Sequence, residues 1–207
     1  MDELADILAI SQLIYWERHW RDKGQWENMR SAYHPESVVR VAWFQGTGFE
    51  FVEASKGMHR QGQSKHRLSP TLVRLHGDRG LAETDTVIET RTLFRDMEVD
   101  TTANCRLFSR VRRDDGVWRL ASLDVIYEKD MLTPVNPSDH LMINREEIQR
   151  YRPSYRFLCY TLHSIGRSVD PTLPGDDRPD LVAALYTEAE DWLMKKHEPA
   201  DLSSGGQ

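Results

Sequence analysis

Apolar residues recur at helical spacing over the first twenty residues of the chain, with acidic, basic and amide side chains between them. These apolar positions are Leu4, Ile7, Leu8, Leu13, Ile14, Trp16 and Trp20. The pattern predicts an amphipathic helix over Asp2–Trp20, which Lys23-Gly24 ends. Apolar residues continue at the same spacing over Trp26–Tyr33, and His34-Pro35 stops this second, shorter helix.

The pattern then changes to β-branched and alternating segments, which are typical of strands. The expected strands are Val38–Phe44, Ser64–Leu75, Leu81–Phe94, Thr102–Arg112 and Trp118–Tyr127. A short helix over Phe49–Met58 interrupts them. Gly77-Asp78 and Asp115-Gly116 are tight-turn signals, whereas Asp96–Asp100 is expected to be a longer connection. Helices followed by long strands joined by hairpins indicate an α+β fold, with helices on one face of a curved antiparallel sheet.

The composition shifts after Leu132–Pro137, where we expect the chain to leave the sheet. Periodic apolar residues predict a helix over Arg145–Ser164, broken near Pro153, and another over Arg178–His197. We therefore divide the chain into an α+β domain at 1–137, a C-terminal helical extension at 138–199 and a tail at 200–207 that is disordered by composition.

The composition is that of a chain that can bury a core. Hydrophobic residues make up 39% and charged residues 29% of the 207 residues, which excludes global disorder. The net charge of −6 argues against a nucleic-acid partner, since such surfaces show a basic excess. The N-terminus is acidic, and no apolar run approaches the ~20 residues of a membrane span. We expect a soluble cytoplasmic protein with no membrane partner.

The sequence carries no motif for a cofactor or a metal. The patterns GxxxxGK[ST], GxGxxG and GxSxG do not occur. Cys105 and Cys159 are the only cysteines, and the eight histidines show no HExxH or paired-ligand spacing. We therefore expect neither a cofactor nor a metal ion.

Several phrases occur in an order that points to one family. They are DKGQWENM from Asp22, YHPES from Tyr33, Phe44-x-Gly46, the run His66–Thr84, and DDGVWRL followed by YEKD at Tyr127. Over about Ala5–Pro137 they resemble the SnoaL-like group of the nuclear transport factor two-like superfamily. That group includes scytalone dehydratases, ketosteroid isomerase-like enzymes, polyketide cyclases, bile-acid dehydratases and hexachlorocyclohexane dehydrochlorinases. The chain also has the general appearance of the diarylpropane formaldehyde lyases of lignin catabolism.

The resemblance implies a cone-shaped α+β barrel, closed at one end, with a deep pocket between helices and sheet. In its dehydratase and dehydrochlorinase members, an Asp at the end of the first long helix pairs with a His on a strand. Asp22 and His66 match these two positions. Another His that members often carry is absent, because Val41 and Ala42 occupy its region.

We therefore expect His66 to be a general base and Asp22 to be the carboxylate that orients it. An imidazole with a pKa of ~6.5 accepts a proton at neutral pH, and a neighbouring carboxylate fixes its tautomer. The alternatives are an exposed histidine at a strand end and a solvated acid at a helix end.

Tyr15 lies two helical turns before Asp22 on the same face, so we expect its hydroxyl to assist departure of the leaving group. Core packing is the equal alternative for this side chain. The expected substrate-binding residues are Trp20, Trp43, Asn104 and Tyr127. Aromatic rings more often belong to a core, and polar strand residues are more often satisfied within a sheet.

These residues predict a cofactor-independent lyase or dehydratase that eliminates water or formaldehyde from a hydroxylated aromatic or polycyclic small molecule. An isomerase or cyclase of the same fold is the near alternative. A non-catalytic small subunit, like the β subunit of ring-hydroxylating dioxygenases, and a binding module without turnover are alternatives from other classes. Relatives imply a homotrimer or homodimer, for which the strand Leu81–Phe94 offers an exposed sheet face.

Overall fold

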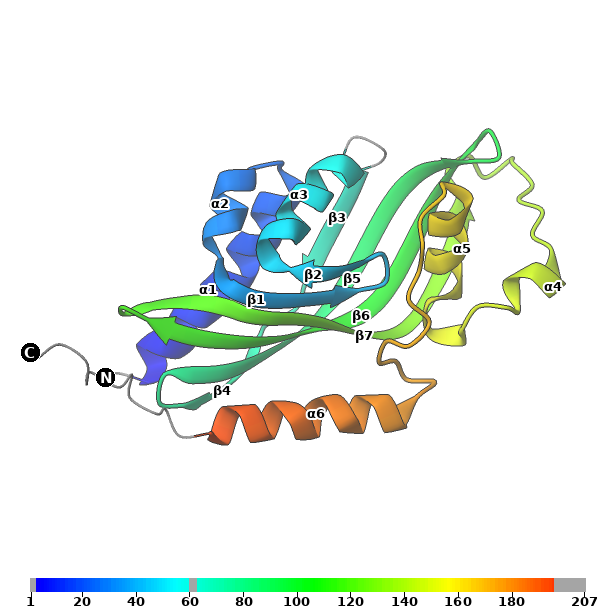
Figure 1. Cartoon of the computed structure of the whole chain (residues 1–207). Helices are drawn as coiled ribbons and strands as arrows, with labels where there is room; N and C mark the ends of the chain where they lie inside the picture. Colours follow the sequence, from blue (N-terminus) through cyan, green and yellow to red (C-terminus); the bar gives the residue numbers. More distant parts are fainter. Residues whose placement is uncertain (1–2, 60–62, 196–207) are drawn as a thin grey trace, which may run out of the picture.

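The computed structural model describes residues 3–59 and 63–195 (Figure 1). Its helices are α1 (Glu3–Asp22), α2 (Trp26–Ser31), α3 (Gly48–His59), α4 (Arg145–Ile148), α5 (Arg156–Ser164) and α6 (Pro179–Met194), with a 3-10 turn η1 (Pro153–Tyr155). Its strands are β1 (Tyr33–Val41), β2 (Phe44–Thr47), β3 (Gln63–Leu68), β4 (Leu72–His76), β5 (Arg79–Phe94), β6 (Met97–Asp114) and β7 (Val117–Pro134). The α+β class predicted from the sequence is confirmed.

The strands form one curved seven-stranded sheet in the order β2-β1-β7-β6-β5-β3, and β4 also pairs with β5. Every pair is antiparallel except β1 and β7, which run parallel. The expected antiparallel sheet is therefore a mixed sheet. The reason is topological, because β2, α3 and β3–β6 together form one long crossover between β1 and β7, and parallel pairing requires such a connection.

The two faces of the sheet are covered by different helices. Successive residues of a strand point to opposite faces, and Leu107 and Phe108 of β6 show the consequence. Leu107 lies in the main core with residues of α1, α3 and α5, whereas Phe108 packs with Leu81 and Ile126 beneath α6. Figure 1 shows α6 along the side of the sheet opposite α1–α3. The face of β5 that we expected to be exposed is thus partly covered, and Leu81 is buried.

Two element boundaries near the N-terminus differ from the sequence-based expectation. Tyr33 begins β1 instead of ending a helix, and Pro35 lies inside that strand. The register with β7 shifts between Tyr33 and Val38, so Pro35 falls where no backbone N–H is needed for pairing. The expected strand Val38–Phe44 is divided, because the chain turns at Ala42-Trp43 and returns as β2.

The remaining differences also concern where strands end. The expected strand Ser64–Leu75 is two strands, interrupted at 69–71, where Pro70 cannot donate a backbone hydrogen bond. The expected connection Asp96–Asp100 is mostly strand, because a tight turn with positive φ at Arg95 and Asp96 joins β5 to β6. Strand β7 continues to Pro134, beyond the expected end at Tyr127.

The C-terminal extension is helical, as predicted, and the break near Pro153 is present between α4 and α5. Helix α6 covers most of the expected helix Arg178–His197. His197 and the tail that we expect to be disordered lie outside the described residues. None of the helices in the described ranges combines the length and the apolar character needed to cross a membrane.

Candidate active site

Asp22 and His66 form a doubly hydrogen-bonded pair between α1 and β3. The Asp22 Oδ1 atom lies 2.6 Å from His66 Nδ1, and Asp22 Oδ2 accepts the backbone N–H of His66 at 2.7 Å. Helix α1 ends at Asp22, and Gly24 turns the chain with a φ of +67°, so the carboxylate projects from the helix end towards β3. One carboxylate therefore fixes both the ring and the main chain of the histidine.

The imidazole of His66 is neutral at pH 7. Burial lowers the pKa of His66 to about 4, because the hydrogen bond to Asp22 only partly offsets desolvation and Arg21 and Arg18 add positive charge nearby. Burial acts to raise the pKa of Asp22, but its hydrogen bonds with His66 hold that pKa below the usual value. A carboxylate at Oδ1 selects the tautomer with the proton on Nδ1. Nε2 is then unprotonated and has no hydrogen-bond partner among the described residues.

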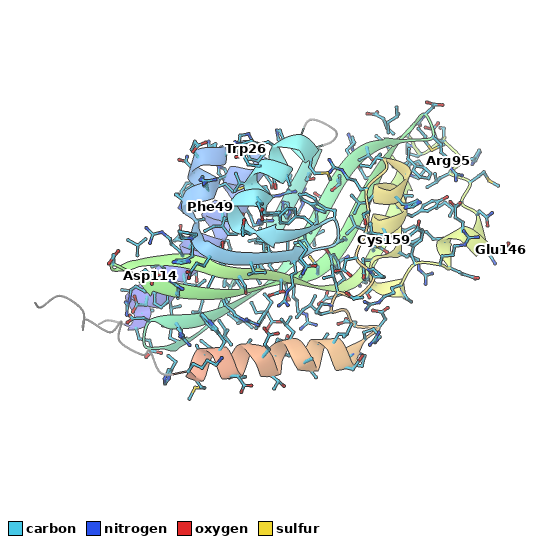
Figure 2. The ribbon with its side chains drawn as sticks, viewed as in Figure 1. Trp26, Phe49, Arg95, Asp114, Glu146 and Cys159 are labelled. Carbon is cyan, nitrogen blue, oxygen red and sulfur yellow. The ribbon has the colours of Figure 1, made fainter. Side chains whose placement is uncertain are left out.

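A partly open cavity of about 70 Å³ adjoins this pair. Its wall is mainly apolar and includes Val41, Trp43, Phe51, Met58, Ile88, Leu107, Val125, Leu158, Leu162 and Ile165. Its polar lining consists of Arg18, Arg21, Ser64, His66, Thr90, Thr92, Tyr127 and Thr161. Leu158, Thr161, Leu162 and Ile165 all come from α5 or its end, so the C-terminal extension closes one side of the cavity. Figure 2 shows α5, which carries the labelled Cys159, over the curved strands.

Tyr127 of β7 is one of the residues that line the cavity. The oxygen accepts the backbone N–H of Ala42 at 3.0 Å, and the ring stacks on Tyr155 with a centroid distance of 4.5 Å. Burial raises the pKa of Tyr127 well above its usual value, so the phenol stays protonated. Because the oxygen already accepts from Ala42, the hydroxyl proton is free for an acceptor in the cavity.

A buried ionic cluster at the end of α1 supports the wall of the cavity. Arg18 donates to both carboxylate oxygens of Glu17, and the Tyr33 hydroxyl donates to the same carboxylate at 2.8 Å. All three side chains are buried. Burial acts to lower the pKa of Arg18, but the contact with Glu17 raises it above its ordinary value. Arg18 is therefore permanently charged and neutralised within the cluster.

A model of the SnoaL-like domain matches residues 2–124 of the chain, which is more than half of it. The chain belongs to the SnoaL-like family. It is 30% identical to Pea pathogenicity protein 2 of Fusarium vanettenii over 204 residues, which cover 94% of this chain and 87% of that protein. That similarity extends past the family match into the C-terminal extension.

Solved structures show the same fold as this SnoaL-like protein. A hexachlorocyclohexane dehydrochlorinase, LinA type 2, superimposes with a TM-score of 0.57 at 16% identity, covering 69% of this chain and 96% of that one. A scytalone dehydratase-like protein of Novosphingobium aromaticivorans gives 0.55 at 15% identity, covering 67% and 97%. At this identity the likeness establishes the nuclear transport factor two-like fold alone. Members of the family act on small molecules as dehydratases, isomerases or cyclases.

The structure separates the residues predicted for the SnoaL-like site into two groups. Trp43 and Tyr127 line the cavity with His66. Tyr15 lies instead in an outer groove of about 620 Å³ with Asp22, and its hydroxyl donates to the Ser69 carbonyl at 3.2 Å. His66 lines both the groove and the cavity.

Trp20 and Asn104 contact neither space. The Trp20 ring stacks on Trp16 at 5.7 Å, and Asn104 is half-buried on β6. In addition, no group of three or more His, Cys, Asp or Glu side chains suited to a metal ion occurs in the described part of the chain.

Sequence-based reasoning missed Arg18, Arg21 and Thr92. The arginines share a buried helix face with Ile10 and Ile14, at the helical spacing that an apolar stripe would occupy. A charged residue on the apolar stripe of a helix was the signal that would have identified them. Thr92 lies within an alternating strand, where the sequence alone does not show which neighbours it meets.

Proposed function

We propose that this protein is a cofactor-independent lyase in which His66 is the general base and Asp22 is the residue that orients it. The observation that carries the proposal is a neutral, buried imidazole with one nitrogen held by a carboxylate and the other without a partner among the described residues. A base must be unprotonated at the working pH and within reach of its substrate. The small-molecule activities of the SnoaL-like family agree with such a site.

The reaction begins when His66 Nε2 takes a proton from a substrate carbon next to an activating group. The imidazolium that forms is stabilised by the Asp22 carboxylate, as in other carboxylate–histidine pairs. The electron pair of the broken C–H bond forms the new double bond, and the C–O bond to the leaving hydroxyl breaks. The imidazolium or the Tyr127 hydroxyl then protonates hydroxide to water.

The same pair also accommodates loss of formaldehyde. If His66 takes the proton of a primary hydroxyl group, the oxygen electrons form the carbonyl of formaldehyde as the carbon–carbon bond breaks. The carbanion left behind then takes up a proton. Both reactions require the imidazole to face the substrate and need no electron acceptor.

We infer that the substrate is hydroxylated and aromatic or polycyclic, because the wall of the cavity is mainly apolar with aromatic rings. The cavity volume of about 70 Å³ is far smaller than that of a typical ligand pocket of about 300–1,000 Å³. Single-ring compounds therefore fit this cavity better than polycyclic compounds.

The test is a screen of hydroxylated aromatic compounds for release of water or formaldehyde, repeated with His66→Ala and Asp22→Asn. We expect His66→Ala to lower kcat/KM by at least about a hundredfold and Asp22→Asn to lower it by a similar factor. His76→Ala is the matched control, because His76 is exposed at the end of β4, and it should retain full activity. Full turnover by His66→Ala would defeat the proposal.

The products distinguish the neighbouring activities. An isomerase returns the proton to another carbon, so its product has the mass of the substrate, and a cyclase product contains a new ring. Binding without any product would instead indicate a binding module, and a requirement for another chain would indicate a subunit.

A further inference from the structure

Four charged side chains lie close together at the C-terminal end of α1, and three of them make side-chain hydrogen bonds. The Glu17 carboxylate accepts hydrogen bonds from the Arg18 guanidinium and from the Tyr33 hydroxyl. Both carboxylate oxygens of Asp22 are hydrogen-bonded to His66. Arg21 is the fourth charged group.

Arg21 has no hydrogen-bonded carboxylate among the described residues. Its nearest carboxylate oxygen is Asp22 Oδ1, at 4.0 Å from Nη1, which is beyond hydrogen-bond distance. Its Nε atom is buried and has no hydrogen-bond partner in the described part of the chain. The side chain is only 9% exposed and lies over the adjoining rings of Trp43 and Phe51, with its central carbon 5.9 Å from each ring centroid.

A buried guanidinium without a hydrogen-bonded anion is costly to the folded protein. Burial and the positive charge of Arg18 lower the pKa of Arg21 to about 10, and the group is still charged at pH 7. A buried cation without a hydrogen-bonded anion is strongly unfavourable unless a ligand completes it. Thr92 also lines the cavity, and its Oγ1 atom is buried without a hydrogen-bond partner among the described residues.

We propose that Arg21 binds a carboxylate group of the substrate, so that the compounds that this site accepts are small carboxylic acids. A guanidinium is planar and presents parallel N–H donors that match the two oxygens of a carboxylate. Thr92 and Tyr127 line the same cavity and each carries a hydroxyl group that can donate a hydrogen bond. This inference names the substrate class of the lyase site proposed above and rests on that proposal for its link to turnover.

A bound carboxylate would also assist His66. Arg21 is one of the charges that lower the pKa of His66. A negative charge placed against Arg21 offsets this effect and makes the imidazole a stronger base when substrate is present. The substrate would thereby activate the base that acts on it.

The test is calorimetric binding to the full chain of two pairs of compounds that are alike in shape, acetate with acetamide and benzoate with benzamide. Two pairs are used so that the size of the cavity does not decide the result. We expect at least one carboxylate to bind about tenfold or more tightly than its amide. The proposal is overturned if each acid binds no better than its amide, or if neither acid binds at millimolar concentration.

Arg21→Met removes the charge and should abolish the preference for the acid, while Arg21→Lys should retain part of it. Arg67→Met is the matched control, since Arg67 is exposed on β3 and pairs with Glu89, and it should bind as the parent does. Persistence of the preference in Arg21→Met would overturn the proposal.

Stability provides a second readout that a merely structural role would move in the other direction. Arg21 makes no hydrogen bond that the described structure would lose, so Arg21→Met should melt at the same or a higher temperature than the parent. A clearly lower melting temperature would overturn the proposal.

This experiment separates the two proposals. Acid binding through Arg21 in a protein whose turnover does not depend on His66 would leave the carboxylate site standing and defeat the lyase mechanism. Turnover of neutral compounds that depends on His66 and is unaffected by Arg21→Met would support the lyase mechanism and defeat the carboxylate site.

Discussion

The Asp130 carboxylate on β7 accepts the backbone N–H of Leu158, in the first turn of α5, at 2.8 Å. This bond fastens the helix that closes one side of the cavity to the sheet beneath it. Burial raises the pKa of Asp130 to about 6, because its hydrogen bonds to the backbone of Leu158 and Phe157 only partly offset desolvation. Its Oδ1 atom is buried without a partner in the described structure.

The anchor at Asp130 predicts opposite effects of two substitutions. An Asn at this position still accepts from Leu158 and carries no charge, so Asp130→Asn should be at least as stable as the parent at pH 8. Asp130→Ala leaves that N–H unpaired and should lose about 1–3 kcal/mol in chemical denaturation. Since folding raises this pKa from 3.8 to about 6, the parent should lose stability relative to Asp130→Asn as pH rises through that window. A relative gain would contradict the assignment.

The buried state of His66 predicts acid sensitivity. Folding lowers its pKa from 6.5 to about 4, so the unfolded chain binds the proton more readily between these values. The free energy of unfolding should therefore fall by on the order of 3 kcal/mol as pH falls from 6.5 to 4. Urea titrations across this range measure the effect. His66→Gln should flatten the profile, and His76→Ala should leave it unchanged.

Arg21 should control the basicity of His66. Because Arg21 is one of the charges that lower the pKa of His66, Arg21→Met should raise that pKa. Titration of the imidazole resonances by NMR measures the shift. Arg67→Met, on the opposite side of β3, is expected to leave the pKa of His66 unchanged. An equal pKa of His66 in both variants would contradict the role assigned to the Arg21 charge.

Tyr127 and Tyr15 are distinguished by a pair of conservative substitutions. Tyr127→Phe leaves the buried N–H of Ala42 without its acceptor and should cost about 1–3 kcal/mol as well as activity. Tyr15→Phe removes only a bond to the Ser69 carbonyl beside the outer groove and should change stability by less than about 0.5 kcal/mol. Loss of turnover in Tyr15→Phe alone would assign the leaving-group role to Tyr15.

Helix α6 contributes a separate packing surface on the outer face of the sheet. Leu185 is buried there against Phe108 and Ile126, so Leu185→Ala should lose about 2–4 kcal/mol in thermal or urea unfolding. Met194→Ala is the matched control on the same helix, because Met194 is 59% exposed, and it should be nearly neutral. Equal melting temperatures would show that α6 adds little to the stability of the sheet.

The sequence by itself determined the class of the fold and predicted that Asp22 and His66 form a pair. Helical and alternating periodicities depend on neighbours within a segment, so they identify α1, α3 and the long strands without knowledge of what packs on them. The match of Asp22 and His66 to family positions paired a helix end with a strand 44 residues away. The break of the C-terminal helix followed from Pro153, whose effect is equally local.

Only the tertiary structure decided what surrounds that pair. The parallel pairing of β1 with β7, the closure of the cavity by α5 and the covering of the outer face by α6 depend on contacts between distant segments. The same is true of the surroundings of Arg21, because its place on the apolar stripe of α1 is visible in the sequence but its neighbours are not. The burial of Arg21 and its lack of a hydrogen-bond partner for Nε among the described residues follow from packing, and they are the basis for proposing that it binds a ligand.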